Sequence, residues 1–254
     1  MDPDRSARTG MSVPHPQQSI ETIVNLFAEP VHVQTAVEAE LGYADGNGKF
    51  TKCVPEPQFQ AIKSLLESAT WTKYDADWRV RVSYKIKDEE NHDMLSLSYV
   101  DDPSAVQCCK HFVVEPVLWF CGERAINVMV STRKRVCVPP PHPGTRYSSV
   151  TITRFKEYVR NSSAAPGVSW AYRIGVVWEG TCVKGAYAAA PRFTVNITMR
   201  RDQSAQGYVA CANKGMQTSL ARNMHGKVED MLKAGEDRLE KVGIIPVQGY
   251  KFSA

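Results

Sequence analysis

Residues 77–87 read DWRVRVSYKIK, and the side chains of this stretch alternate between two kinds. Val80, Val82, Tyr84 and Ile86 share one parity, whereas the positions between them carry Arg, Ser or Lys. Neighbouring side chains of a β-strand point to opposite faces. The pattern therefore predicts a strand with one apolar face and one cationic face.

The same alternation recurs along most of the chain and decides the fold class. No helical pattern interrupts the series, which disfavours a parallel βαβ fold. Helical spacing appears before and after it, at residues 17–29, 56–70 and 217–243. We therefore expect an α+β fold, an antiparallel sandwich or closed β-barrel of about eight strands with flanking helices. The further strand-like runs are residues 33–43, 94–100, 125–136, 149–159, 170–180 and 192–201.

Composition restricts the class of protein without naming it. The chain has 254 residues and a net charge of +4, which is compatible with an anionic ligand. Its seven cysteines form no CxxC pair, so a zinc site or a disulfide framework is not indicated. No stretch reaches the roughly 20 apolar residues that span a bilayer. We expect a disordered lead-in at 1–17, one domain at 18–246 and a tail at 247–254.

The polar faces of the strands allow two interpretations. In one, they face water on the outside of a sheet or sandwich. In the other, they line the inside of a closed barrel whose apolar faces are turned outward under helices or a partner. Several cationic faces directed into one lumen would repel one another unless a polyanion lay between them. The second interpretation therefore predicts a polyphosphate site.

The order of the motifs resembles a known family, the fungal and protozoan type of RNA 5′-triphosphatase, an mRNA-capping enzyme with the triphosphate-tunnel fold. A Glu-x-Glu strand opens that family, and VEAELG supplies Glu38 and Glu40 here. The later motifs follow in the family's order: FQAIKSLLE at 59–67, VRVSYK at 80–85, TITRFKEYV at 151–159, YRIGVVWEG at 172–180, FTVNITMR at 193–200 and the helix at 217–241.

The resemblance implies a role for each group of charged residues. Glu38 and Glu40 would hold Mg²⁺ or Mn²⁺ weakly through carboxylate oxygens. The alternatives are that these glutamates balance lumenal cations or are simply solvated. Cations would contact the phosphate oxygens, or else lie on a solvated sheet face: Arg79, Arg81, Lys85, Arg154, Lys156 and Arg173.

Three departures from the family pattern put hydrolysis in doubt. The second Glu-x-Glu becomes Asn196-Ile197-Thr198, and the aspartate of the I-D-L-T strand becomes Gly175. In the strand NVMVSTRKR, Arg133 stands at the position of a glutamate. Loss of one positioning or electrostatic group commonly costs about 100-fold or more in rate. Phosphate binding needs only the cations.

Three hypotheses of function follow. The first is a tunnel pseudoenzyme that binds RNA 5′-triphosphate ends with weakened or lost hydrolysis. The second is an active metal-dependent RNA 5′-triphosphatase of cap formation. The third is a structural barrel subunit of a larger RNA-processing or transcription complex. The partners would be an RNA 5′ end and a protein partner or second subunit, with no membrane. An intracellular location is expected, with the nucleus favoured and the mitochondrion left open.

Overall fold

The structure, a computed structural model, describes most of the chain in nine segments. The expected tail at 247–254 lies outside the described segments, and so does the expected lead-in except for residues 16 and 17. The single domain at 18–246 stays a prediction. The described segments are residues 16–28, 35–44, 49–87, 94–101, 106–119, 126–139, 145–163, 165–201 and 213–241.

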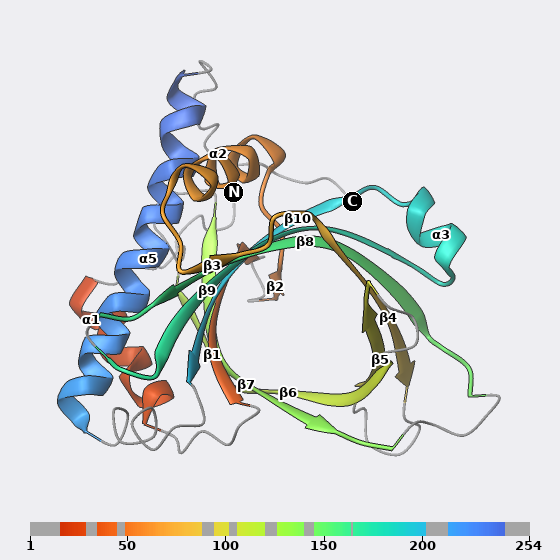
Figure 1. The fold of residues 1–254 in the computed structure, drawn as a ribbon, viewed down its shortest axis with the longest axis horizontal. Coiled ribbons are helices and arrows are strands. Elements are labelled where there is room, and N and C mark those ends of the chain that lie inside the picture. Colours follow the sequence, from red (N-terminus) through yellow and green to blue (C-terminus); the bar gives the residue numbers. More distant parts are fainter. Residues whose placement is uncertain are drawn as a thin grey trace, which may run out of the picture.

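Long antiparallel strands dominate the fold, as the alternation predicts (Figure 1). Two short strands, β2 (Phe50–Thr51) and β3 (Lys73–Tyr74), pair with β1 and β8. The long strands are β1 (Thr35–Ala44), β4 (Arg79–Lys87), β5 (Met94–Val100), β6 (Gln107–Trp119), β7 (Asn127–Cys137), β8 (Ser149–Asn161), β9 (Val168–Gly180) and β10 (Arg192–Arg201).

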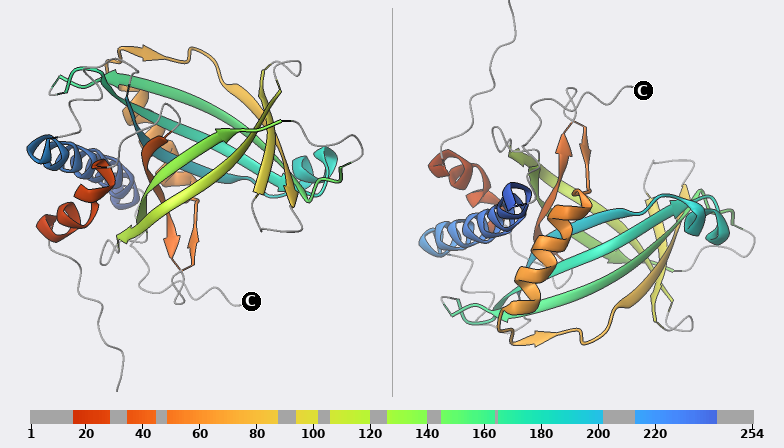
Figure 2. Two further views of the ribbon diagram at one scale, coloured as in Figure 1. Left: turned by 90° about the horizontal axis from the view of Figure 1, so that it is seen from below. Right: turned by 90° about the horizontal axis from the view of Figure 1, so that it is seen from above.

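The pairings of the long strands return to their starting point. The order runs β10-β9-β8-β4-β5-β6-β7-β1, and β1 also pairs with β10. In that last pairing Glu38 lies opposite Thr198, and Glu40 lies opposite Asn196. Figure 1 looks along the interior that these strands surround, and Figure 2 shows the ring from two further directions. The α+β class and the antiparallel arrangement are confirmed.

Among the long strands, β6 was not expected from the sequence. Its register against β7 shifts between Val114 and Val117, and Pro116 lies in that interval. A bulge adds a residue to one strand and inverts the parity beyond it. Pro also lacks a ladder donor, and within sheets it is found at such irregularities. The alternation of β6 is therefore broken in the sequence although the strand itself continues.

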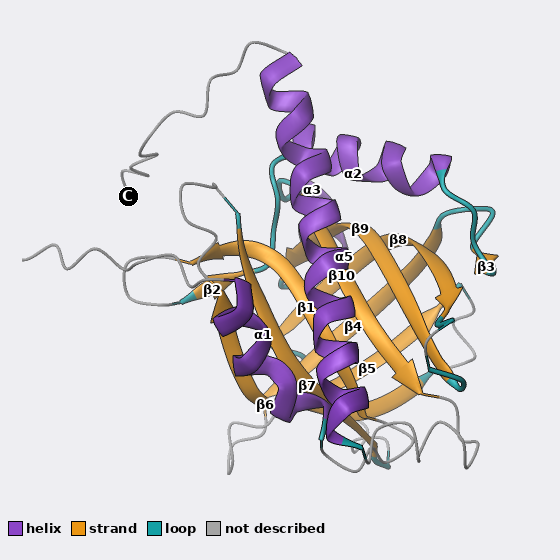
Figure 3. Ribbon diagram, turned by 90° about the vertical axis from the view of Figure 1, so that its left-hand side faces the viewer, coloured by secondary structure: helices purple, strands orange, loops and turns teal. Residues whose placement is uncertain are grey.

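Helices cover the outside of one part of the ring (Figure 3). The main core contains apolar residues of α1, the 3₁₀ turn, α2 and α5, packed on strands that include β1, β7, β9 and β10. No helix of the described segments combines the length and apolar character needed to cross a membrane. The helices are α1 (Pro16–Val24), η1 (Asn25–Phe27), α2 (Glu56–Ser68), α3 (Val183–Ala188) and α5 (Lys214–Lys241).

The position of the core decides which strand face is inside. Val37, Ala39 and Leu41 of β1 are buried in the helix-covered core, as are Val195 and Ile197 of β10. Because parity alternates along a strand, the residues between them face the interior of the ring. The polar parity thus lies inside and the apolar parity outside.

Candidate functional site

Among the residues that the structure describes, the inner face of the ring carries three clusters of ion pairs, each with partners from different parts of the chain. We name them by one carboxylate each. The Glu38 cluster contains Glu38, Glu40, Arg133 and Lys52. The Glu157 cluster contains Glu157, Arg173 and Arg200, and the Glu179 cluster contains Glu179, Lys85 and Arg192.

In the Glu38 cluster a guanidinium lies between two buried carboxylates. Arg133 Nε is 2.5 Å from Glu38 Oε2, and its Nη2 donates to Glu40 Oε2 at 2.6 Å. Lys52 Nζ lies 2.7 Å from the same Glu40 oxygen. Asn196 Nδ2 donates to Glu38 Oε1 at 2.5 Å. Both oxygens of Glu38 are therefore engaged by groups of the chain itself.

Burial dominates the electrostatics of this cluster. Glu38 and Glu40 are only 7% and 5% exposed. Removal from water raises the pKa of Glu38 to about 7, opposed by the Arg133 charge and assisted by Glu40. Burial also raises the pKa of Glu40, again against the pull of Arg133. Arg133 is thus the main group that favours the ionised form of these carboxylates.

The Glu157 cluster joins three neighbouring strands. Arg200 forms a bidentate pair with Glu157, at 2.8 Å from Nη1 to Oε1 and 2.5 Å from Nη2 to Oε2. Arg173 Nη2 donates to Glu157 Oε2 at 2.7 Å. Burial alone would raise the pKa of Glu157, but the two guanidinium groups outweigh it and lower the pKa to about 2. Glu157 is therefore a firmly ionised carboxylate.

A phenylalanine lies among the cations inside the ring. The guanidinium carbons of Arg173, Arg81 and Arg79 are 4.9, 5.3 and 5.7 Å from the centroid of the Phe155 ring. Cations are attracted to an aromatic face at such distances. Phe155 thus provides a dry contact for three arginines, two on β4 and one on β9.

Cations outnumber carboxylates in two of the three clusters. Glu157 is shared by Arg173 and Arg200, and Glu179 is shared by Lys85 at 3.1 Å and Arg192 at 2.5 Å. Each of these clusters therefore carries a surplus positive charge. Phosphate oxygens are suitable acceptors for such a surplus, particularly from arginine.

The Glu38 cluster does not fit a divalent ion as it stands. A hard cation takes several oxygen ligands, whereas Arg133 already lies between Glu38 and Glu40. The residues opposite are the uncharged Thr198 and Asn196. Among the described residues there is no group of three or more His, Cys, Asp or Glu side chains that could hold a metal.

The structure separates the predicted phosphate contacts into two sets. Arg81, Lys85 and Arg173 lie on the inner face, and Arg79 reaches the same Phe155 ring while pairing with Asp101 at 3.0 Å. Their contact with phosphate stays a prediction.

Arg154 and Lys156 lie on the other face of the sheet, so the structure does not bring all six predicted phosphate contacts together. On β8 they pair with Val176 and Ile174 of β9, which belong to the helix-covered outer face. Arg154 also lies 5.4 Å from the Trp78 ring centroid. The physical reason is parity, since Glu157 and Phe155 take the inward positions of this strand.

Four charged residues of these clusters were not predicted from the sequence as site residues. Arg192 and Arg200 share the parity of Asn196 on β10, which was the available signal. Glu157 shares the parity of Phe155, but the resemblance pointed to its neighbours Arg154 and Lys156 instead. The pairing of Lys52 with Glu40 had no local signal, because Lys52 follows the short β2.

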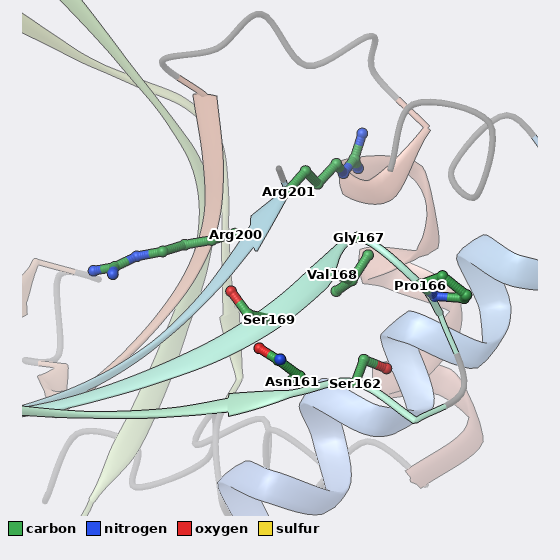
Figure 4. Close-up of a pocket in the computed structure, with 8 residues that line it drawn as sticks. All are labelled: Asn161, Ser162, Pro166, Gly167, Val168, Ser169, Arg200 and Arg201. Atoms are coloured by element: carbon green, nitrogen blue, oxygen red, sulfur yellow. The ribbon is translucent and has the colours of Figure 1, made fainter. Parts of the chain in front are cut away.

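A cavity of about 500 Å³ adjoins the Glu157 cluster through Arg200. Figure 4 shows Arg200 and Arg201 pointing in different directions from the end of β10. Arg201 Nη2 donates to the carbonyl of Phe27 at 3.1 Å. The cavity is lined by Asn161, Ser162, Pro166, Gly167, Val168, Ser169, Arg200 and Arg201.

The architecture, a strand ring with a polar inner face and helices outside, is the fold of RNA triphosphatases of known structure. The S. pombe Pct1 RNA triphosphatase matches with a TM-score of 0.58 at 12% identity, over 97% of this chain and 99% of that one. Pct1 in complex with the Spt5 CTD matches with a TM-score of 0.54 at 11% identity, over 94% of this chain and 96% of that one.

A viral structure shares the fold as well. The RNA triphosphatase domain of the trifunctional mimivirus mRNA capping enzyme matches with a TM-score of 0.51 at 9% identity, over 81% of this chain and 98% of that one. No protein-family model and no curated protein sequence matches the chain. At these identities the likeness establishes the fold and leaves the chemistry to the site.

Proposed function

We propose that the inside of the strand ring is a tunnel that binds the 5′-triphosphate end of RNA, with weakened or lost hydrolysis. The observation that carries this proposal is Arg133, which lies between Glu38 and Glu40 at 2.5 and 2.6 Å. The guanidinium of Arg133 thereby occupies the position between the two glutamates that a catalytic metal ion would need.

The surplus charge of the ring supports triphosphate as the ligand. Arg173 and Arg200 both donate to Glu157, and Lys85 and Arg192 both donate to Glu179. An arriving phosphate oxygen can accept a hydrogen bond from one cation of each cluster while the other cation retains the carboxylate. Such charge-assisted bonds are about twice as strong as neutral ones.

The position of Glu38 argues against efficient turnover. A carboxylate whose pKa is near 7 is only partly ionised at neutral pH and so is a weakened metal ligand. The facing amide of Asn196 cannot replace a second ligating carboxylate. The residues that remain bind and orient phosphate but do not activate an attacking water.

The test compares matched RNAs and matched arginine variants. Fluorescence anisotropy with chelator present should show tighter binding of 5′-triphosphate RNA than of 5′-monophosphate or 5′-hydroxyl RNA. Arg173→Ala should weaken the triphosphate complex by roughly 10-fold or more. Arg154→Ala, on the next strand but on the outer face, should leave the affinity nearly unchanged.

Two results would contradict the proposal. One is equal affinity for the 5′-triphosphate and 5′-hydroxyl RNAs. The other is release of γ-phosphate that depends on Mg²⁺ or Mn²⁺ and is abolished by Glu38→Ala, which would establish an active RNA 5′-triphosphatase instead. The proposal also includes a protein partner and a location in the nucleus. The S. pombe Pct1 structure with the Spt5 CTD supports testing for such a partner.

A further inference from the structure

Two cysteines face each other across the pairing of β6 and β7. Cys109 and Cys137 are Cα partners, and their sulfurs lie 3.7 Å apart. A disulfide bond is about 2.05 Å long, so these sulfurs are adjacent but not bonded. We propose that Cys109 and Cys137 are an oxidisable dithiol, which closes to a cross-strand disulfide through exchange with a low-molecular-weight disulfide such as glutathione disulfide.

The backbone at this position suits a disulfide. Val138 N donates to the carbonyl of Cys108 at 3.0 Å, which makes these two residues a hydrogen-bonded pair of the antiparallel ladder. The next pair, Cys109 and Cys137, is then a non-hydrogen-bonded pair, and opposite Cα atoms of such pairs are about 4.5 Å apart. Disulfides span Cα separations of about 4.4–6.8 Å. The bond can therefore form by side-chain rotation without moving either strand.

The exposure of the two thiols sets the order of the reaction. Cys137 is exposed, whereas Cys109 is 0% exposed. The Cys137 thiolate attacks one sulfur of glutathione disulfide, forms a mixed disulfide and expels one glutathione thiolate. Cys109 then attacks the Cys137 sulfur and expels the second glutathione, whose sulfur takes up the proton of the Cys109 thiol. Two protein thiols are oxidised and one glutathione disulfide is reduced to two thiols.

A third cysteine is close in the sequence but points the other way. Cys108 has the opposite parity on β6 and packs with Ile86 in a separate small cluster. Burial raises the pKa of the Cys108 thiol, and the neighbouring Cys109 and Cys137 raise it further. Its thiol is thus both turned away from Cys137 and held in the less reactive protonated form. The facing pair is therefore Cys109 with Cys137.

The cross-link would lie inside the ring. Cys137 has the same parity on β7 as Arg133, which contacts Glu38 and Glu40 on the inner face. On β6 the register irregularity between Val114 and Val117 disrupts the ladder farther along the same pairing. A covalent bond at Cys109 and Cys137 would hold this pairing in one register.

The experiment uses the full chain in glutathione buffers of increasing oxidised fraction. Remaining thiols are blocked with iodoacetamide, and the peptides are identified by mass spectrometry. We expect a Cys109–Cys137 cross-linked peptide with the loss of two hydrogens. The melting temperature should rise by several degrees and return on reduction.

Three variants separate this site from general thiol oxidation. Cys109→Ala should stop the reaction at glutathione on Cys137, and Cys137→Ser should yield neither the cross-link nor the rise in melting temperature. Cys182→Ser is the matched control, because Cys182 is also an exposed cysteine and serine is a good N-cap for α3. It should oxidise as the parent protein does.

Any of three outcomes would overturn the inference. These are both thiols still alkylated in the most oxidising buffer, stable glutathione on Cys137 in the parent protein, or a cross-link that contains Cys108. Because Cys137 is exposed, its serine variant keeps the test decisive even if the change at buried Cys109 prevents folding.

Discussion

Replacing Arg133 by methionine tests the central feature of the site. Arg133 lies between Glu38 and Glu40, and 30% of its side chain is exposed. Methionine keeps much of the apolar length of the side chain and removes the charge. Breaking a buried ion pair by removing one partner costs about 3–5 kcal/mol of unfolding free energy. We expect a loss of that order at about pH 8, above the folded-state pKa of Glu38.

Lower pH should reduce this cost. The folded-state pKa of Glu38 is about 7, above the ordinary 4.5. Between these values the folded protein binds more protons than the unfolded chain, so the unfolding free energy falls as pH rises. Without Arg133 the pKa of Glu38 would rise further. At about pH 5.5 the cost of Arg133→Met should therefore be smaller by roughly 1–2 kcal/mol than at about pH 8.

The variant should also gain affinity for a divalent ion. Glu38 and Glu40 would be left without the guanidinium, while Asn196 Oδ1 and Ser131 Oγ are buried oxygens with no hydrogen-bond partner in the described segments. These four residues together offer the all-oxygen surroundings that Mn²⁺ and Mg²⁺ prefer. Mn²⁺ at about 100 times its dissociation constant would return about 2.7 kcal/mol of stability.

The assay is urea unfolding followed by tryptophan fluorescence, with and without MnCl₂, together with calorimetric titration of Mn²⁺. Arg192→Met is the matched control on the same inner face. The Arg192 and Glu179 side chains are 43% and 35% exposed, so losing their ion pair should cost at most about 1 kcal/mol. The reasoning would be refuted if Arg133→Met and Arg192→Met lost the same unfolding free energy. It would also be refuted if Mn²⁺ stabilised the parent protein as much as Arg133→Met.

Four further substitutions test the fold around the site and its helices. Glu157→Gln should make the unfolding free energy less sensitive to acid. Folding lowers the pKa of Glu157 from 4.5 to about 2, which stabilises the fold above pH 4.5 by on the order of 3 kcal/mol and is lost as pH falls toward 2. Urea unfolding at several pH values tests this, and the same pH dependence in the variant and the parent protein would contradict it. Gly42→Ala should destabilise the fold by about 1–3 kcal/mol, because the added Cβ would lie 2.1 Å from the carbonyl oxygen of Thr51. Gly226→Ala, where the added Cβ meets open space on α5, should stabilise the fold by about 0.5–1 kcal/mol. Thermal melting should therefore show a lower melting temperature for the first variant and a higher one for the second. Trp71→Phe should cost about 1–2 kcal/mol because the indole N–H donates at 2.6 Å to a carbonyl in the last turn of α2, and an unchanged urea midpoint would count against this cap.

Much of the fold was predictable because strand alternation is local. The parity of residues 79–87 and 192–201 identified which side chains share a face before any pairing was known. The same reasoning failed for β6, whose bulge interrupts the parity at Pro116. It also could not separate Arg154 and Lys156 from the inward residues, because both parities of β8 contain aromatic and charged residues. Only the position of the packed helices shows which of those faces is outside.

The sequence by itself determined the α+β class, the strands with one polar face, and the uncharged residues Asn196 and Thr198 on the strand that pairs with Glu38 and Glu40. The tertiary structure decided what the remaining acids contact. Glu40 and Arg133 are 93 residues apart, yet their side chains meet at 2.6 Å because β1 and β7 pair in one register. Alternation along a strand is a property of the local backbone. The partner of a charge across the ring depends on register, which only the packing of the whole chain determines.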